Sequence, residues 1–342
     1  MSERLTNILG YLTLFAIMGA IWVMFGEDPT REQGARGEHT FAGLDERINE
    51  VAVIAIKEGS ASTTIFRDGG NWRIKERGDY LVDANKVRQM LRGIALSTRR
   101  EPKTANEARY ERLDLGSKAT TIELRDDTDG VLLNFDMGKR KDTADGRSLT
   151  YVFQDRDTRS WLVTDLAETK ASPAWWLQRP LLNIAEERFS DVTIGGAWLT
   201  RKLADKNFSL QGKRPDEAEA GYWVLGDPAR TVATLSFDDV RNLSNPLAEA
   251  TSVVELTTYD GLSLKLSLYE MDGGVWAQVG AAFDATLQSE GAGGELPAAP
   301  ADGAAEASEI SGKVRGWIFK LSESDAETLL RKRADFIGEG TE

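Results

Sequence analysis

Residues that could perform chemistry are few in this 342-residue sequence, and they do not cluster. The chain has no cysteine and one histidine, His39, which excludes disulfides and thiolate metal sites and, within one chain, histidine triads and multi-histidine metal sites. The phosphate-binding loop, the G-x-S-x-G and S-x-x-K nucleophile motifs and the H-E-x-x-H zinc motif do not occur. Adjacent carboxylates are frequent, but 55 acidic residues make such pairs expected. We therefore predict no catalytic residue, no cofactor and no metal site.

One acidic stretch, residues 125–136 with the sequence RDDTDGVLLNFD, is spaced somewhat like a calcium-binding loop. Its first position is Arg125 rather than an acid, and its twelfth is Asp136 rather than the bidentate glutamate that such loops use. The alternating VLLNF segment is typical of a strand. The pattern favours a hairpin that turns at Asp129-Gly130 over a calcium site.

Two short segments could contact a partner or a membrane. Trp175 and Trp176 are adjacent on a predicted short helix, where two neighbouring side chains cannot both face one core. The alternative is that both pack between two lobes. Lys139, Arg140 and Lys141 form a small basic cluster that could touch lipid phosphates or an acidic partner. The alternative there is a solvated hairpin loop.

A membrane anchor is predicted near the amino terminus. Residues 8–25 carry no charge, and 18 helical residues rise about 27 Å, close to the hydrocarbon thickness of a bilayer. A cleaved signal peptide is the rival interpretation, but the apolar run is long and lacks a clear small-x-small site. We expect residues 1–26 to hold a short cytoplasmic end and the anchor, with the body in the periplasm.

The charge balance limits the partners of that body. The formal net charge is -13, which repels polyanions. Nucleic acid is therefore not an expected partner, whereas the membrane is, through residues 8–25. Residues 27–44 are polar and glycine-rich and are predicted to be a flexible tether.

The order of predicted elements occurs twice along the remaining chain, as strand, hairpin, helix, hairpin, strand and helix. This indicates an α+β fold built by internal duplication, with two related lobes of antiparallel sheet and packed helices at residues 45–187 and 188–342. Asp83 is the expected N-cap of the first-lobe helix. The corresponding helix of the second lobe is expected within 235–252. The matched strand segments are 47–56 with 188–198, 63–74 with 208–225, 120–138 with 252–270, and 160–166 with 316–322.

The second lobe contains a segment of unusual composition at residues 280–313. Alanine, glycine and proline make up 18 of its 34 positions, and acids outnumber bases six to one. Such a segment buries little apolar surface, so we predict a disordered loop within the lobe.

The sequence resembles a bacterial family known as domain of unknown function 4340. The resemblance rests on the N-terminal apolar segment, NWRI, DANKVRQMLRGI followed by STRREPK, YERLDLGSKATTIEL, YVF and AWWLQRPLLNIAEERFSDVTI. It covers roughly residues 45 to 200. It implies an inner-membrane or exported protein, often associated with ABC transport systems of the gliding-motility auxiliary type, and it assigns no activity.

These observations favour a non-enzymatic, single-pass protein of the bacterial inner membrane. We expect it to be an accessory or binding component of an ABC-type transport or envelope system, with transporter subunits or other envelope proteins as partners. Two alternatives remain open, a carboxylate-dependent hydrolase of envelope glycans and a carrier of lipid or another hydrophobic ligand.

Overall fold

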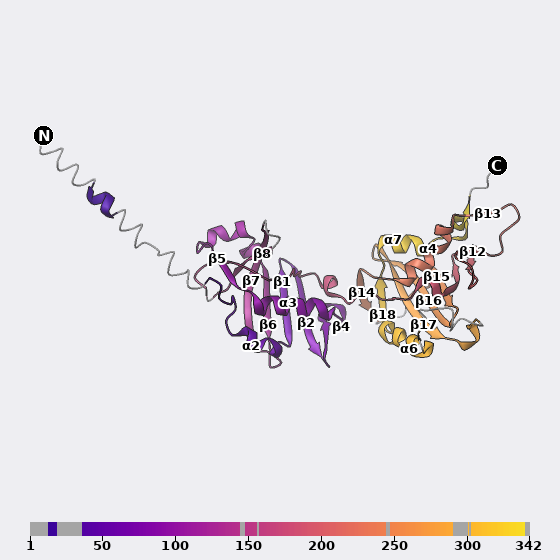
Figure 1. Ribbon diagram of the computed structural model, residues 1–342, viewed down its shortest axis with the longest axis horizontal. Helices are drawn as coiled ribbons and strands as arrows, with labels where there is room; N and C mark the ends of the chain where they lie inside the picture. Colours follow the sequence, from indigo (N-terminus) through magenta and orange to yellow (C-terminus); the bar gives the residue numbers. More distant parts are fainter. Residues whose placement is uncertain are drawn as a thin grey trace, which may run out of the picture. The chain divides into compact units, whose positions relative to one another are not determined.

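The computed structural model describes residues 13–18, 36–143, 148–155, 157–243, 247–289, 300 and 302–338. The fold is α+β, with mostly antiparallel sheets and few helices (Figure 1). The chain forms two compact units. The first contains residues up to Arg67 and Asn85–Ser172, and the second contains Asp68–Ala84 and Pro173–Glu342. The chain therefore passes between the units three times.

The first unit is a twisted antiparallel sheet in which β2, β1, β6, β7, β8, β9 and β5 are neighbours in that order. Helix α3 precedes the edge strand β5. Its apolar residues recur along one face, and Val87, Met90 and Ile94 are buried, which confirms the predicted helix. The bounds are α2 (Leu44–Arg47), η2 (Ile48–Glu50), β1 (Val53–Glu58), β2 (Ala61–Asp68), α3 (Ala84–Leu96), β5 (Arg99–Pro102), η4 (Glu107–Leu113), η5 (Gly116–Lys118), β6 (Thr120–Arg125), β7 (Val131–Asp142), β8 (Ser148–Phe153) and β9 (Trp161–Val163).

The second unit contains an eight-stranded sheet in the order β12-β11-β10-β15-β16-β17-β18-β14. Helices α4 and α7 pack on each other and contact β10 and β17. The bounds are β3 (Asn71–Ile74), η3 (Lys75–Arg77), β4 (Tyr80–Leu81), η6 (Pro173–Trp176), η7 (Glu186–Arg188), β10 (Phe189–Ile194), β11 (Ala197–Thr200), β12 (Ser209–Leu210), β13 (Ala218–Glu219), α4 (Tyr222–Ala233), β14 (Asp239–Asn242), β15 (Ser252–Thr258), β16 (Leu262–Met271), β17 (Gly274–Phe283), η8 (Ala285–Leu287), α6 (Gly303–Val314), β18 (Trp317–Lys320), α7 (Glu323–Leu329), η9 (Arg333–Phe336) and β19 (Ile337–Gly338).

The two sheets share one strand order. Seven neighbouring strands of the first unit, β2-β1-β6-β7-β8-β9-β5, correspond in sequence position and pairing to β11-β10-β15-β16-β17-β18-β14 of the second. In each unit a helix, α3 or α4, precedes the strand that takes the edge of the sheet. The two halves of the chain thus have equivalent topology.

Several details of the predicted repeat are wrong. Residues 47–50 form the end of α2 and η2, so the first strand begins at Val53 rather than Arg47. Trp223 lies in helix α4 rather than in a strand matching Trp72. The second-lobe helix expected within 235–252 is that same α4, and residues 239–242 are strand β14. The hairpin predicted at Asp129-Gly130 is confirmed by the pairing of its strands, and the matched segment 252–270 forms a second hairpin that turns at Asp260-Gly261.

The predicted disordered loop at 280–313 is largely wrong where the structure describes it. Strand β17 continues to Phe283, and α6 spans Gly303–Val314. Asp302 caps α6 by accepting a hydrogen bond from the backbone N–H of Ala305. The Ser311 hydroxyl donates to the Ala281 carbonyl over 2.8 Å, so α6 covers the open edge of β17 beyond its short pairing with β18. Residues 290–299 and 301 lie outside the described residues.

The predicted tether at 27–44 is wrong for its second part. Residues 27–35 lie outside the described chain, but Thr40 and Phe41 are buried in the first unit. The Thr40 backbone N–H donates to the Ser97 carbonyl over 2.8 Å, and His39 forms a bridge with Thr98. This segment therefore pairs with the chain just before β5.

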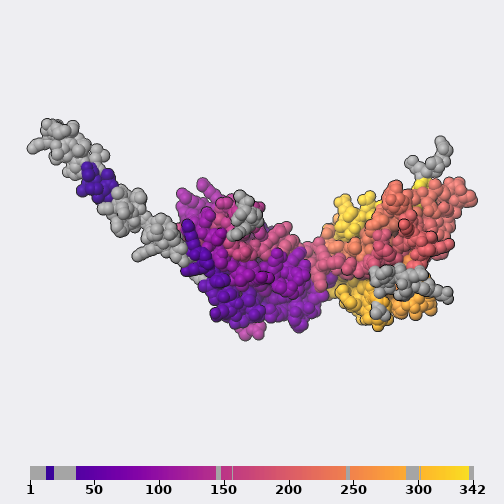
Figure 2. Space-filling view, viewed as in Figure 1, coloured from indigo at the N-terminus to yellow at the C-terminus, as the bar shows by residue number. Residues whose placement is uncertain are grey.

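The domain boundary also differs from the predicted 187/188. The second unit begins its main segment at Pro173 and additionally takes Asp68–Ala84. Tyr80 from that segment lies edge-on to Trp317, with ring centroids 5.0 Å apart, and its ring also meets Phe237 and Phe319. Arg77 makes a bidentate ion pair with Asp239. In the space-filling view, yellow C-terminal residues of this unit lie beside its orange residues (Figure 2).

Only residues 13–18 of the predicted anchor, 8–25, are described, and they are helical. Among the described residues, no helix combines the length and apolar character needed to cross a bilayer.

Candidate functional site

The basic cluster lies on β7 of the first unit, where its three side chains are exposed. Lys139 donates to the Arg112 carbonyl over 2.5 Å, and Arg140 donates to the Ser148 hydroxyl over 2.9 Å. Lys139 lines a hollow of about 790 Å³, whereas Arg140 lines another of about 740 Å³. Neighbouring strand residues point to opposite faces. The structure therefore splits the cluster between two surfaces, and contact by Lys139, Arg140 and Lys141 stays a prediction.

The hollow lined by Arg140 has mixed charge. Arg100 contributes a second cation, while Asp165 and Glu168 contribute two anions. The Thr164 hydroxyl bonds to the Asp165 carboxylate and lies 2.9 Å from the Thr98 hydroxyl. Asp165 has a φ of 66°, which is uncommon for a residue other than glycine. The bonds from Asp165 to Thr164 and from Thr164 to Thr98 tie this turn to the residue before β5.

The tryptophan pair lies on η6 in the second unit. Trp176 is completely buried, so it is a core residue and not a contact residue. Trp175 is half-buried and meets Trp176 edge-on, with ring centroids 4.7 Å apart. The backbone carbonyl of Trp176 accepts from the N–H of Asp83. A surface role is left to Trp175 alone.

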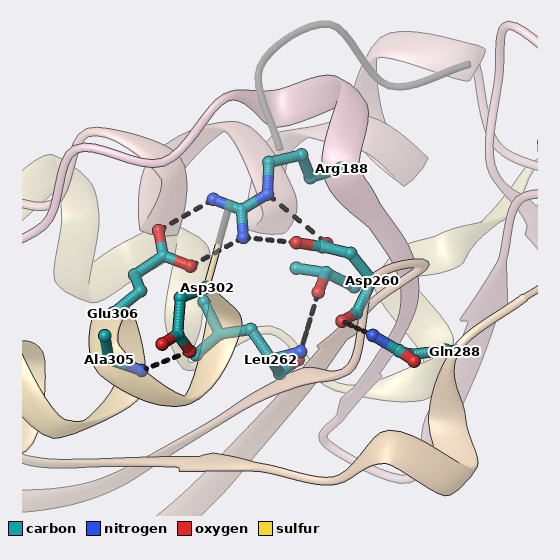
Figure 3. Close-up of polar contacts among 8 residues, drawn as sticks. Arg188, Asp260, Leu262, Gln288, Asp302, Ala305 and Glu306 are labelled. Carbon is teal, nitrogen blue, oxygen red and sulfur yellow. Dashed lines mark hydrogen bonds and ion pairs between the residues drawn. The ribbon is translucent and has the colours of Figure 1, made fainter. Parts of the chain in front are cut away.

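A buried ion cluster centred on Arg188 occurs in the second unit (Figure 3). The Arg188 side chain is 3% exposed and lies at the junction of η7 and β10. Its Nη2 is 2.7 Å from Asp260 Oδ2 and 2.6 Å from Glu306 Oε2, while Nε and Nη1 reach the second oxygen of each carboxylate. One guanidinium thus binds two carboxylates in bidentate fashion.

The two carboxylates come from different elements. Asp260 lies in the turn between β15 and β16, where Gly261 has a φ of 95° that suits glycine. The Asp260 carbonyl accepts from Gln288 Nε2 over 3.1 Å. Glu306 lies in the first turn of α6. The cluster therefore ties this turn and the start of α6 to the start of β10.

Opposing effects act on the ionisation of this cluster. Burial works to raise the pKa of Asp260, but hydrogen bonds and the charge of Arg188 outweigh it and hold that pKa below its ordinary value. Burial works to lower the pKa of Arg188, while Glu306 and Asp260 raise it above its ordinary value. Asp260 and Arg188 therefore both stay charged at neutral pH. Both carboxylates are engaged by Arg188, which suits a structural tie between elements.

A polar hollow of about 480 Å³ lies on the exposed face of the second sheet. Strand pairing places its residues in two rows across β10, β15, β16 and β17. One row contains Thr193, Glu255, Lys265 and Gly280, and the other contains Asp191, Thr257, Ser263 and Ala282.

An exposed tryptophan stands at one end of this polar hollow. Trp198 pairs with Thr193 in the register of β10 and β11 and is 53% exposed. Its indole N–H donates to Asp191 Oδ1 over 3.2 Å. Lys265 Nζ lies 2.9 Å from Glu255 Oε1. The sheet face thus presents an aromatic surface beside carboxylates, hydroxyls and one ammonium group.

Neither the ion cluster nor the polar hollow was predicted from sequence. Arg188 looked like the start of a strand, and Asp260 looked like a turn residue. Trp198 carried a usable signal, because buried Ala197 and Leu199 alternate with it and leave it on the outer face. Among the described residues, no group of three or more histidine, aspartate or glutamate side chains could hold a metal ion.

The family profile described as domain of unknown function (DUF4340) matches residues 72–256. The chain belongs to this family. No curated protein and no solved structure matches the chain.

The DUF4340 match runs through both compact units. It begins in β3 of the second unit, covers residues 85–172 of the first, and ends within β15. Arg188 and Asp191 lie inside the matched range, whereas Asp260 and Glu306 lie beyond it.

Proposed function

We propose that this DUF4340 protein is a non-enzymatic binding component anchored in the bacterial inner membrane. The proposal is carried by the uncharged run at residues 8–25. Within it, helical residues 13–18 leave Leu14, Phe15, Ile17 and Met18 between 52% and 72% exposed. An exposed apolar helix in an uncharged run is what a lipid-facing segment requires.

The charge of the units supports a body held outside the membrane. The first unit contains 23 basic and 24 acidic residues, and the second contains 19 basic and 31 acidic residues. Anionic headgroups repel a surface with the charge of the second unit. We propose that the amino terminus is cytoplasmic and that both units lie in the periplasm.

The proposed partner class is an ABC-type transport system or another envelope assembly. This part of the proposal rests on the family resemblance described above. A non-enzymatic role is favoured because Asp260 and Glu306, the two carboxylates of the buried ion cluster, are both held by Arg188. We also propose that the two units arose by internal duplication, which their shared strand order supports.

Fractionation of the full chain tests the anchor. The protein should remain in the membrane pellet after a high-salt and alkaline wash, and protease added to spheroplasts should digest both units. Ile17→Arg should move a large part of the chain out of the pellet, because an arginine is costly in the bilayer centre. Val131→Arg is the matched control, since Val131 is also exposed but lies on β7, outside the predicted anchor.

Recovery of the unaltered chain in the soluble fraction would contradict the anchor.

Affinity capture of the detergent-solubilised chain, read by mass spectrometry, tests the partner class. We expect the unaltered chain to capture more membrane transport components than Ile17→Arg does. The absence of such components would contradict the proposed transport role.

A further inference from the structure

The polar hollow on the second sheet has the chemistry of a saccharide site. We propose that it binds a neutral oligosaccharide segment, with one sugar ring stacked on Trp198 and its hydroxyls bonded to the side chains of the two rows. This inference goes beyond the proposed anchoring role and does not depend on it. The volume of the polar hollow, about 480 Å³, lies within the range of roughly 300–1,000 Å³ usual for small-molecule sites.

The floor of the polar hollow matches a ligand rich in hydroxyl groups. Asp191 and Glu255 can accept hydrogen bonds, Lys265 can donate them, and the threonine and serine hydroxyls can do both. Gly280 and Ala282 carry little or no side chain, so a flat ring can approach the strand backbone there. An apolar ligand would leave these polar groups without partners, at a cost for each.

Trp198 provides the apolar surface that a sugar ring also needs. A pyranose presents C–H groups on one face, and the negative face of an indole attracts such positive edges. The hydrogen bond from the Trp198 indole N–H to Asp191 restrains the ring at the end of the hollow. An exposed aromatic ring held in this way loses little rotational freedom when a ligand stacks on it.

Charge selects a neutral ligand. The Lys265 ammonium is paired with Glu255, which leaves Asp191 as the remaining charge of the two rows. The second unit as a whole has 31 acidic and 19 basic residues. An anionic sugar would therefore be repelled, whereas a neutral one loses no ionic hydration on binding.

Calorimetric titration of the full chain tests the proposal. The chain is solubilised in a detergent without a sugar headgroup and titrated with triacetylchitotriose and cellotriose, with trigalacturonate as the anionic probe. At least one neutral trisaccharide should bind with a Kd of about 1 mM or lower, and trigalacturonate should bind more weakly.

Two variants locate the binding. Trp198→Ala should weaken the neutral trisaccharide at least about tenfold, or about 1.4 kcal/mol. Trp223→Ala is the matched control, because Trp223 is 57% exposed but lies on α4, and it should leave affinity unchanged. Asp191→Asn, which keeps the side-chain shape, should also weaken binding. It replaces Trp198→Ala as the test of the site if Trp198→Ala fails to fold.

Three results would overturn the proposal. The first is no binding of either neutral trisaccharide at 10 mM ligand, on the order of ten times the expected limit for Kd. The second is tighter binding of trigalacturonate than of the neutral trisaccharides. The third is an equal loss of affinity in Trp198→Ala and Trp223→Ala. Membrane fractionation reports separately on the anchor, so failure here leaves that proposal standing, and failure of the anchor leaves this one.

Discussion

The guanidinium of Arg188 joins three segments that are far apart in sequence. Asp260 and Glu306 are 72 and 118 residues away from it along the chain. Desolvation makes a buried ion pair a modest stabiliser, but removal of one partner leaves charges buried without compensation. The importance of Arg188 therefore shows most clearly when it is removed.

Replacement of Arg188 should destabilise the second unit. Arg188→Met leaves two carboxylates close together without their cation, and we expect a loss of about 3–5 kcal/mol in unfolding free energy. Urea denaturation measures it. Arg230→Ala is the control, because the Arg230 side chain is 52% exposed in its ion pairs and should cost less than about 1 kcal/mol. Similar losses for the two variants would contradict a structural role for the cluster.

Tyr80 should make the second unit sensitive to alkali. Burial raises the pKa of Tyr80 from 10.0 to about 12, so the folded chain holds its phenol proton more tightly than the unfolded chain. The resulting stability is complete below pH 10 and is lost as pH rises from 10 to 12. One pKa unit corresponds to about 1.4 kcal/mol.

Comparison with Tyr80→Phe isolates this effect from other titrating groups. Between pH 10 and 12, the unfolding free energy of the variant should fall by up to about 2.7 kcal/mol less than that of the unaltered chain. Unfolding free energies measured across that range check the difference. Parallel pH profiles for the two proteins would show that Tyr80 does not keep its proton in the folded state.

At the scale of elements, two helix-interior glycines have opposite surroundings. A Cβ on Gly93 of α3 would clash with the Asp165 carbonyl oxygen, whereas a Cβ on Gly312 of α6 meets nothing within 4 Å. The first glycine permits a close approach between helix and loop. The second only weakens its helix, because glycine is a poor helix former.

The same substitution should therefore act in opposite directions. Gly312→Ala should raise the unfolding free energy by about 0.5–1 kcal/mol, and Gly93→Ala should lower it by at least about 1 kcal/mol, because the backbone must shift. Thermal and urea unfolding measure both. Stabilisation by both substitutions would mean that the loop at Asp165 moves away at little cost.

Helix α6 shows where composition misleads. The alanine- and glycine-rich segment 280–313 predicted disorder, yet Ala307, Ile310 and Val314 recur at helical spacing and are buried. These three buried residues suffice to hold α6 in place because Asp302 caps the helix and Ser311 bonds to Ala281 on the edge of β17 that α6 covers. The bonding partner of Ser311 lies in another element, so the sequence of α6 alone does not reveal it.

For the whole molecule, strand order was more predictable than boundaries. Period-two alternation and the Asp-Gly turns indicated the hairpins β6-β7 and β15-β16 and the later strands β9 and β18, which depend on local patterns. The division into units was not predictable, because Tyr80 is held by Phe237, Trp317 and Phe319, which follow it by more than 150 residues. The polar hollow was missed for the same reason, as its rows run across strands.

The second unit should depend on its early segment. A fragment containing Pro173–Glu342 without Asp68–Ala84 exposes the aromatic faces that Tyr80 covers and leaves Asp239 without Arg77. We expect a loss of at least about 3 kcal/mol, comparable to deletion of a buried aromatic side chain. Urea unfolding and dye binding to exposed apolar surface report it.

Rejoining the segment provides the control. The same fragment with Asp68–Ala84 attached through a glycine-serine linker should regain most of the lost stability. Equal stability of the two fragments would show that the segment adds nothing to the second unit.

The second unit is assembled from two separate stretches of the chain, which are synthesised at different times. Tyr80 leaves the ribosome long before Phe319, and at roughly 5–20 residues per second the intervening chain takes about 12–48 s to make. Throughout that interval the phenol ring has no aromatic partner from β18. The segment Asp68–Ala84 should therefore stay incompletely packed, and open to chaperones and proteases, until translation is nearly finished.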